Sequence, residues 1–454
     1  MIRLRTLLPL IAFVAAACSL VPAELQRELL PSSTLYKTAE AAYQVLIERH
    51  VDKPSSKTLL GGALDGAITE ARKQGATDSG LPSTPLSLTG STWSDFAKFS
   101  DRLDAIVAAT PSADKTKLER AAVDGMAKSM NECHTYYLDP TRAKSFNQPQ
   151  PPVSGIGVQI NKPAVDQPIE VVRVYAGTPA DRAGIKEGDK IVTVDGQDVT
   201  DLQTEEVANK VRGAEGTPVT IGVRRGQASY SFTINRARFA VPLETDTLID
   251  GNIGRIVVPQ LVGAVADEVS AAVKRLDASG ADAIILDLRS DPGGDLSAAV
   301  DIASIFVRQG TLVYQTGRDG NRTALDVNRR FYFPKPKPLV VLVNRNSASG
   351  AEIIAAGIRA NDAGTVMGTQ TAGCVGTGQP RDLPDGGLLL VTITKIQDAK
   401  TGAELNGPSR GIVPDQVIDQ PSGAQGDPQL EAAVAYLKTK IARTTKVPEL
   451  LLAA

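Results

Sequence analysis

Two apolar strands, each followed by a tight turn and a helix, constrain the fold of this chain more than any other feature of its sequence. The run Pro338–Val343 precedes the turn Asn344–Glu352, and the run Ile284–Arg289 precedes the turn Ser290–Gly294; a helical pattern follows each turn. The same alternation of strand and helix continues from about residue 242 onward. This pattern predicts an α/β core, with a buried, mainly parallel sheet covered by helices.

The first of these turns carries two serines, Ser347 and Ser349, either of which is a candidate nucleophile. A serine between a strand and a helix has an exposed hydroxyl beside the free N–H groups and the positive dipole end of the helix. Such a hydroxyl can attack a carbonyl group whose oxyanion those N–H groups stabilise. The alternative is that Ser347 or Ser349 only caps the helix. The glycines of Ser290–Gly294 favour the catalytic interpretation, because they allow backbone N–H groups to point at a ligand.

The first 18 residues predict an export signal. Arg3 and Arg5 precede the apolar run Leu7–Ala17, which is too short to span a membrane. Ala15–Cys18 resembles a bacterial lipobox, so Cys18 is the candidate for lipidation, with plain signal cleavage as the alternative. We therefore expect an exported protein, in the periplasm or lipid-anchored on the outer face of the cytoplasmic membrane. A formal net charge of −2 gives no basis for nucleic-acid binding.

A β-rich unit from about residue 154 to 239 resembles a PDZ domain over its whole length. The resemblance rests on the loop Gly155–Gly157, the helix start Thr178–Ala180 and the hairpin Val194–Gly196. In such domains the loop offers backbone N–H groups to a peptide carboxylate, and the next strand pairs with the peptide. The peptide-binding candidates are Gly155, Ile156, Gly157 and Val158. The alternative is a PDZ domain that serves only as a spacer.

The order of these segments is similar to that of the carboxyl-terminal (tail-specific) processing peptidases. Their Ser-Ala-Ser-Ala-Ser-Glu motif matches Ser347–Glu352, and its middle serine, the nucleophile, matches Ser349. Their Asn-Pro-Gly-Gly turn matches Asp291–Gly294, and their Gly-Ile-x-Pro-Asp element matches Gly411–Asp415. The resemblance implies an oxyanion hole formed by the N–H of Gly350 with that of Gly293 or Gly294.

The resemblance also implies the architecture: a peptidase core of crotonase/ClpP-like βαβ units, preceded by the PDZ domain and an N-terminal helical segment. The expected segments are a signal peptide at 1–18, a tether and helical segment at 19–150, the PDZ domain at 151–240, the core at 241–425, and a C-terminal helix and tail at 426–454. The expected partners are polypeptides with free C-termini and, through the lipid anchor, a membrane. No cofactor or metal is expected.

One departure from the family pattern affects the chemistry. The family uses a lysine about 25 residues beyond the serine as general base, and Cys374 occupies that position here. A serine hydroxyl needs a base within hydrogen-bonding reach. The candidates are His134, a thiol at Cys374, which is a weak base, and Lys395, for which a surface position is the alternative.

His134 is the preferred candidate, because a tricorn-like branch of the same superfamily pairs a histidine from the segment before the PDZ domain with its serine. That branch also needs a carboxylate shortly before the Gly-x-x-Pro-Asp element, and Glu404 is the candidate. The alternative is a purely structural histidine. The other histidine, His50, lies among polar helix residues with no catalytic group nearby.

Two further hypotheses follow. If His134 approaches Ser349, then Cys133 approaches Cys374, and the two thiols can form a disulfide provided that their Cα atoms lie within about 7 Å. Glu352, three residues after Ser349, is expected to act as a capping-box acid rather than in catalysis.

For the whole chain, a serine endopeptidase with an acyl-enzyme mechanism is the first hypothesis. An inactive, peptide-binding adaptor lipoprotein is the second, because the family lysine is missing.

Overall fold

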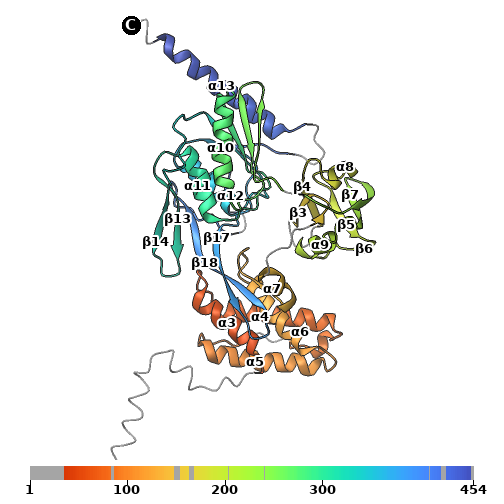
Figure 1. Ribbon diagram of the computed structural model, residues 1–454. Coiled ribbons are helices and arrows are strands. Elements are labelled where there is room, and N and C mark those ends of the chain that lie inside the picture. The colour runs from red at the N-terminus through yellow and green to blue at the C-terminus, as the bar shows by residue number, and fades with distance from the viewer. Residues whose placement is uncertain are drawn as a thin grey trace, which may run out of the picture. The chain divides into compact units, whose positions relative to one another are not determined.

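The computed structural model describes residues 35–82, 86–147, 154–162, 168–202, 204–239, 241–407, 410–420 and 426–450 (Figure 1). The signal segment and Cys18 lie outside the described residues. The described part of the chain divides into two compact units, of which the first comprises the described residues of 35–44, Ser55–Ser129 and Leu383–Asp385. No helix among the described residues is long and apolar enough to cross a membrane.

The first unit consists of helices. Its elements are α3 (Lys37–Arg49, which continues into the second unit), α4 (Ser56–Lys73), η1 (Asp78–Gly80), α5 (Thr92–Ala109) and α6 (Lys115–Lys128). Helices α4 and α6 touch backbone to backbone: a Cβ at Gly125 would lie 2.1 Å from the carbonyl oxygen of Gly62. A Cβ at Gly66 would likewise lie 2.1 Å from the oxygen of Ala121. Glycine is therefore required where these two helices cross.

In the second unit, β1 (Tyr136–Leu138) and α7 (Pro140–Asn147) precede a β-rich part. Its five-stranded path runs β3-β4-β5-β7-β8, with β6 paired to β5, and β2 pairs separately with β9. The strands are β2 (Ser154–Gly155), β3 (Val158–Asn161), β4 (Ile169–Val174), β5 (Lys190–Val194), β6 (Gln197–Asp198), β7 (Pro218–Arg225), β8 (Ala228–Asn235) and β9 (Ala237–Arg238). The helices are α8 (Pro179–Ala183) and α9 (Thr204–Val211), and β3 is left at one edge of the sheet.

The following α/β part is built on a six-stranded sheet in the order β10-β11-β12-β15-β16-β19. All neighbours in this sheet are parallel except β10 and β11. The strands are β10 (Thr245–Ile249), β11 (Ile253–Val257), β12 (Ala283–Asp287), β15 (Leu339–Val343), β16 (Thr365–Gly368) and β19 (Gln416–Val417). Strands β12 and β15 are buried along their whole length, as their continuous apolar sequences predict.

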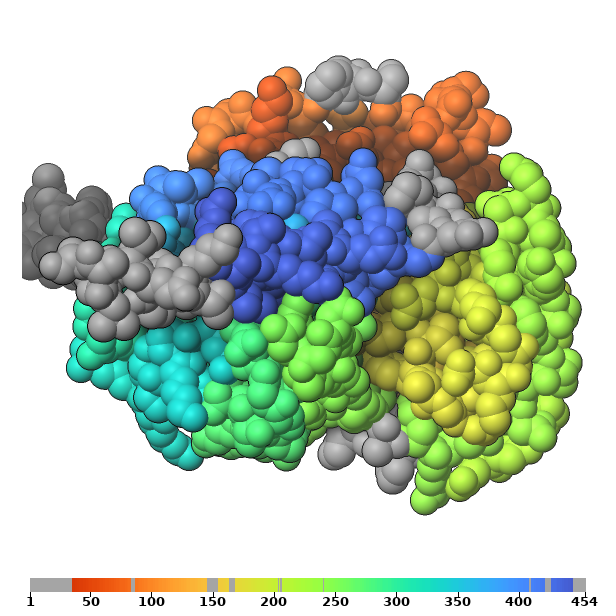
Figure 2. Space-filling model, turned by 90° about the horizontal axis from the view of Figure 1, so that it is seen from above, coloured from red at the N-terminus to blue at the C-terminus, as the bar shows by residue number. Residues whose placement is uncertain are grey.

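Alternate residues of β12 bury opposite faces of this sheet. Ile284 and Leu286 pack with α10 (Val265–Ala278), α11 (Leu296–Phe306) and α12 (Gly350–Ala360). Ile285 packs on the other face with α13 (Pro428–Leu450). In Figure 2 the deep-blue atoms of α13 lie beside the green atoms of the segment that contains β10 and β11, in agreement with this packing. The core is therefore a three-layer α/β structure.

A second, antiparallel sheet completes the core. Its path is β1-β18-β13-β14, with β17 also paired to β18. The remaining strands are β13 (Thr311–Gly317), β14 (Arg322–Asp326), β17 (Gly376–Asp382) and β18 (Leu388–Asp398). Strand β1, which begins two residues after His134, pairs with β18 at Tyr136–Leu390. This pairing brings the segment before the β-rich part to the core sheet, although more than 200 residues separate the two in sequence.

We expect Gly125→Ala to destabilise the helical unit by about 1–3 kcal/mol, because the new methyl group collides with backbone rather than with a flexible side chain. The measurement is the free energy of unfolding from denaturant titration. The matched control is Gly61→Ala in the same helix pair, where no atom lies within 4 Å of the added carbon. That change should stabilise the protein by up to about 1 kcal/mol. Equal effects of the two substitutions would contradict the close helix contact.

Candidate active site

Ser349 lies at a strained turn between β15 and α12. Its φ of 53° and ψ of −115° are backbone angles that residues other than glycine rarely adopt, at a cost of about 1–3 kcal/mol. The neighbouring candidate Ser347 is fully buried, and its hydroxyl donates to the carbonyl oxygen of Leu288 at 2.8 Å. Ser347 therefore ties the turn to the end of the neighbouring strand β12. Ser349, in contrast, is half-buried and lies at the kind of strained strand-to-helix turn that can present a nucleophilic hydroxyl.

Glu352 fixes this turn from within the core. Its carboxylate accepts hydrogen bonds from the N–H groups of Ser349 at 3.0 Å, Gly373 at 2.8 Å and Cys374 at 3.0 Å, and from the hydroxyl of Thr371 at 2.5 Å. The Ser349 N–H also donates to the carbonyl oxygen of Cys374 at 2.8 Å. Complete burial raises the pKa of Glu352, and these hydrogen bonds oppose the rise. The predicted capping-box role of Glu352 is confirmed.

The glycine turn after β12 lies directly against Ser349. A Cβ at Gly293 would lie 2.7 Å from Cβ of Ser349 and 2.6 Å from the nitrogen of Gly350. The N–H of Gly293 donates to Oδ1 of Asp291 at 2.8 Å, so it is occupied. The N–H groups of Gly350 and Gly294, in contrast, donate to no other described residue. Of the two expected combinations, the pair Gly350 and Gly294 is the one that is free to bind an oxyanion.

Asp291 is a buried carboxyl group beside this turn. It is fully buried, and its Oδ2 has no hydrogen-bond partner among the described residues. Burial raises the pKa of Asp291 to about 7, against the opposing effects of the Gly293 N–H and the positive charge of Arg173. Asp291 is thus a group close to the nucleophile whose protonation changes near neutral pH.

His134 and Cys374 come together next to the serine turn. Cys133 and Cys374 form a disulfide with Cα atoms 5.8 Å apart, which confirms the hypothesis of a bridge. Nδ1 of His134 lies 3.2 Å from Sγ of Cys133 and 4.0 Å from Sγ of Cys374. Cys374 therefore connects His134 to Ser349, because its sulfur faces the imidazole and its carbonyl oxygen accepts the Ser349 N–H. The described residues include no direct hydrogen bond from the Ser349 hydroxyl to an imidazole or amine.

A buried carboxylate, Glu132, organises the loop that carries His134. It accepts the N–H of His134 at 2.8 Å and the hydroxyl of Thr392 at 2.6 Å, and its Oε2 lies 4.0 Å from Nδ1 of His134. Burial acts to raise the pKa of Glu132, but the nearby His50 imidazole and the hydrogen bonds from Thr392 and the His134 N–H hold it at about 2. Burial lowers the pKa of His134, and the charge of Glu132 opposes this effect. The imidazole next to the disulfide is therefore neutral at neutral pH.

The interpretation of His50 from sequence was wrong. His50 is completely buried, and its Nε2 lies 3.7 Å from Oε1 of Glu132. Both histidines of the chain thus face the same carboxylate. Glu132 is visible in the sequence just before Cys133 and His134. Its pairing with His50, about 80 residues away, is set by the fold and could not be predicted from the sequence.

Glu404 and Lys395 are paired with each other rather than with His134 or Ser349. Lys395 contacts Glu404 at 2.9 Å and also pairs with Asp52, while Arg410 contacts Glu404 at 2.7 Å. Partial burial acts to lower the pKa of Lys395, but its hydrogen bonds to Asp52 and Glu404 raise it overall. A protonated lysine cannot accept a proton, so Lys395 does not replace the missing family lysine. Among the described residues, no hydrogen bond or ion pair joins Glu404 to His134.

Comparisons with known proteins identify the family of this chain. Residues 252–418 match the model of peptidase family S41, and residues 170–225 match that of the PDZ domain. The chain is 31% identical over 307 residues to the carboxyl-terminal-processing protease of Synechocystis sp., covering 66% of this chain and 71% of the relative. It is 30% identical over 344 residues to the carboxy-terminal processing protease CtpA of Bacillus subtilis, covering 75% and 72%. The chain belongs to peptidase family S41.

A solved structure shows the same fold. The photosystem II D1 C-terminal processing protease superposes with a TM-score of 0.62 at 22% identity, over 88% of this chain and 96% of that one. The chain is therefore a serine-type peptidase with a PDZ domain, as its sequence predicts. The finer comparison with crotonase/ClpP-like units stays a prediction, and so do the domain boundaries.

The loop Gly155–Gly157, the candidate for peptide binding in this S41 peptidase, has free backbone donors. Gly157 has a φ of 88°, and a Cβ at this position would lie 2.2 Å from the side chain of Thr178. The carbonyl groups of Ile156 and Gly157 accept hydrogen bonds from Ala180 and Tyr175 inside the PDZ domain. The N–H groups of Ile156 and Gly157 donate to no other described residue. This arrangement leaves a nest of donors suited to a carboxylate.

The strand that follows this loop touches both turns of the candidate active site. On β3, Nε2 of Gln159 donates to the carbonyl oxygen of Ser290 at 2.8 Å, and Nδ2 of Asn161 donates to Oδ1 of Asn346 at 3.0 Å. Ser290 and Asn346 belong to the turns after β12 and β15. The edge strand that would pair with a peptide is therefore next to the nucleophile.

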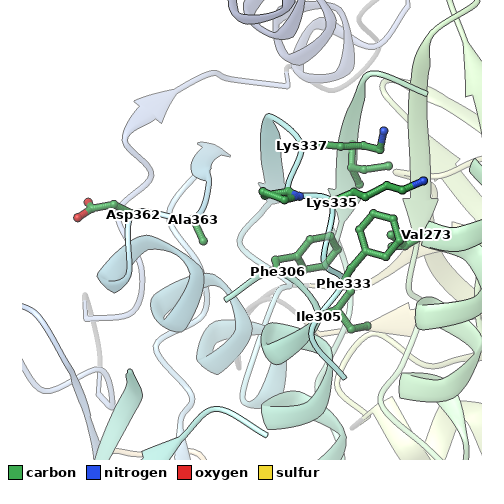
Figure 3. Close-up of a pocket in the computed structure, with 10 residues that line it drawn as sticks. Val273, Ile305, Phe306, Phe333, Lys335, Lys337, Asp362 and Ala363 are labelled. Atoms are coloured by element: carbon green, nitrogen blue, oxygen red, sulfur yellow. The ribbon is translucent and has the colours of Figure 1, made fainter. Parts of the chain in front are cut away.

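A separate apolar pocket in the core is not part of this site. Figure 3 shows Phe306 and Phe333 in its lining, with Lys335 and Lys337 beside them. Both lysines pair with Asp277. None of the predicted site residues lines this pocket.

We expect Asp291→Asn to stabilise the protein above neutral pH. The folded state holds the Asp291 proton up to a pKa of about 7, whereas the unfolded chain releases it near 3.8. Wild-type stability therefore falls as the pH rises between these values and stays low above them. The measurement is the difference in Tm between variant and wild type at pH 4.5 and pH 8. This difference should be larger at pH 8, while the exposed Asp382→Asn control should show no such trend. A pH-independent difference for Asp291→Asn would contradict the raised pKa.

Proposed function

We propose that this S41 peptidase is an exported, tail-specific endopeptidase that binds polypeptide C-termini through its PDZ domain and cleaves by an acyl-enzyme mechanism. The observation that carries this proposal is the strained Ser349 turn, with Gly293 packed against it and the N–H groups of Gly350 and Gly294 free. A hydroxyl with unoccupied backbone donors at its own helix start and in the adjoining glycine turn is the combination that acyl transfer uses.

In the first step the Ser349 hydroxyl attacks the scissile carbonyl carbon, and the N–H groups of Gly350 and Gly294 bind the oxyanion that forms. Each such donor contributes up to about 3 kcal/mol to transition-state stabilisation. The amine leaves with a proton, and water then releases the acyl group from Ser349. The backbone of Ser349 is already fixed before substrate binds, because its N–H donates both to the Glu352 carboxylate and to the carbonyl oxygen of Cys374.

His134 serves as the general base in this mechanism. Cys374 is in the disulfide and has no thiol, and Lys395 is protonated in its pairs with Asp52 and Glu404. His134 is the remaining candidate, and Cys374 places it beside the serine turn. Catalytic hydrogen bonds are often long before substrate binds and shorten in the complex. Glu132, which contacts the His134 backbone, takes the orienting role that the sequence assigned to Glu404.

The PDZ domain selects substrates by their free carboxylate. The N–H groups of Ile156 and Gly157 bind the carboxylate, and the edge strand β3 pairs with the residues before it. Since side chains of β3 contact both catalytic turns, a bound tail lies close to the nucleophile. Export agrees with the Cys133–Cys374 bridge, because disulfides persist in oxidising compartments. The lipid anchor at Cys18 belongs to the same proposal.

Active-site labelling tests the mechanism. A fluorophosphonate probe should label the protein, and Ser349→Ala should abolish the label. His134→Gln should slow labelling by about 10²–10⁴-fold, the usual contribution of general acid–base catalysis. Glu132→Gln should slow it to a smaller extent, whereas Glu404→Gln should leave the rate almost unchanged. Full labelling of His134→Gln would refute its role, and absent labelling of the wild type at all pH values would leave only the adaptor function.

Peptide binding tests the role of the PDZ domain. A peptide with a free carboxylate should bind to the Ser349→Ala protein, and the same peptide with an amidated C-terminus should bind at least about tenfold more weakly. The physical reason is the loss of a charge-assisted hydrogen bond to the free N–H groups. Gly157→Val should remove this discrimination, because its side chain would collide with Thr178. Equal affinity of the two peptides for the Ser349→Ala protein would contradict carboxylate recognition.

A further inference from the structure

The disulfide and the imidazole next to it contain the ligand set of a metal site. Sγ of Cys133, Nδ1 of His134 and Sγ of Cys374 all lie within 4.8 Å of one another. Two sulfurs and one imidazole nitrogen are ligands that zinc and related soft cations prefer. The three residues come from two segments that are 241 positions apart, so the fold and not the local sequence brings them together.

We propose that reduction of the Cys133–Cys374 bridge creates a site for a zinc-class divalent cation, and that binding of this cation prevents His134 from acting as base. Zn²⁺ binds thiolate at about 2.3 Å and imidazole at about 2.0 Å, so tetrahedral coordination places sulfur and nitrogen ligands about 3.5 Å apart. The two observed distances from Nδ1 to sulfur, 3.2 Å and 4.0 Å, lie on either side of this value. Rotation of the cysteine side chains after bond cleavage is sufficient to separate the sulfurs.

The reductive step is open to solvent. Cys133 is exposed, and Cys374 is partly exposed, so a small reductant can reach the bridge. A dithiol reductant breaks the S–S bond by exchange, gives two electrons and two protons to the protein sulfurs, and leaves as a cyclic disulfide. The cation then displaces the two thiol protons and binds both thiolates with Nδ1 of His134. Water completes the coordination at a fourth position.

Metal binding and general-base catalysis exclude each other at this imidazole. A neutral imidazole that uses Nδ1 to bind a metal carries its proton on Nε2, and neither nitrogen can then accept the Ser349 proton. This consequence rests on the proposed role of His134, whereas the metal site itself does not. The bridge and the cation thus define two states of the same three residues: an oxidised state with a free imidazole and a reduced state with a bound one.

Cobalt spectroscopy tests the site without reference to activity. The protein is reduced with a trialkylphosphine, desalted under anaerobic conditions and titrated with Co²⁺, whose thiolate complexes absorb in the near ultraviolet. We expect one Co²⁺ per chain in the reduced protein, its displacement by Zn²⁺, and no thiolate–cobalt absorption in the oxidised protein. Cys133→Ser, Cys374→Ser and His134→Gln should each lose or weaken this signal. Asn131→Gly is the matched control, because Asn131 lies in the same loop, already has a positive φ and removes no ligand atom.

The outcomes separate the two proposals. Reduced protein that shows two titratable thiols but no thiolate–cobalt absorption overturns the metal site. If the site forms, fluorophosphonate labelling of the reduced protein should fall at least about 10²-fold on addition of Zn²⁺ and return after chelation, in line with the loss of a general base. Unchanged labelling with Zn²⁺ bound overturns the coupling. Absent labelling of the oxidised, metal-free protein counts against the peptidase mechanism and not against the cation site.

Discussion

The carboxylate of Glu352 is the constraint on which the catalytic geometry depends. It is completely buried, and it accepts four hydrogen bonds from Ser349, Thr371, Gly373 and Cys374. A carboxylate without such partners would be too costly to bury. Three of these bonds, from Thr371, Gly373 and Cys374, join the start of α12 to the loop before β17. Through them, the backbone of the nucleophile and that of Cys374 form one rigid element, and the disulfide extends this element to His134.

A disulfide-bonded cysteine stands at the position where the family has its basic lysine. In the family pattern a lysine at the position of Cys374 would be the base, and here a sulfur at that position connects the core to the loop that carries an imidazole. Glu132 holds this loop from its other side, with hydrogen bonds to His134 and Thr392. Where the family lysine is missing, the Cys133–Cys374 disulfide therefore links the core to the loop that carries His134. In the proposed mechanism, this connection is what keeps the His134 imidazole close to the serine turn.

Several elements of the site were predictable because local sequence determines them. The apolar strand before Ser349 and the helical pattern after it place the serine at a turn wherever the strand lies in the sheet. The glycines at 293 and 294 indicate a backbone conformation that other residues avoid. The partners of single side chains were less predictable. Glu404 was expected beside His134, but Lys395 and Arg410 surround it, and His50 was expected in a polar setting but is buried against Glu132.

The sequence by itself determined the alternation of strands and helices, the position of the candidate nucleophile, the resemblance to a PDZ domain and the absence of the family lysine. These properties depend on neighbouring residues, whose periodicity and spacing can be read directly. Only the tertiary structure decided that Cys133 meets Cys374, that Glu132 rather than Glu404 faces His134, and that Gly294 rather than Gly293 keeps a free N–H. The physical reason is that such contacts join segments far apart in the chain. Burial and hydrogen-bond partners in the folded state, not residue type, set their chemistry.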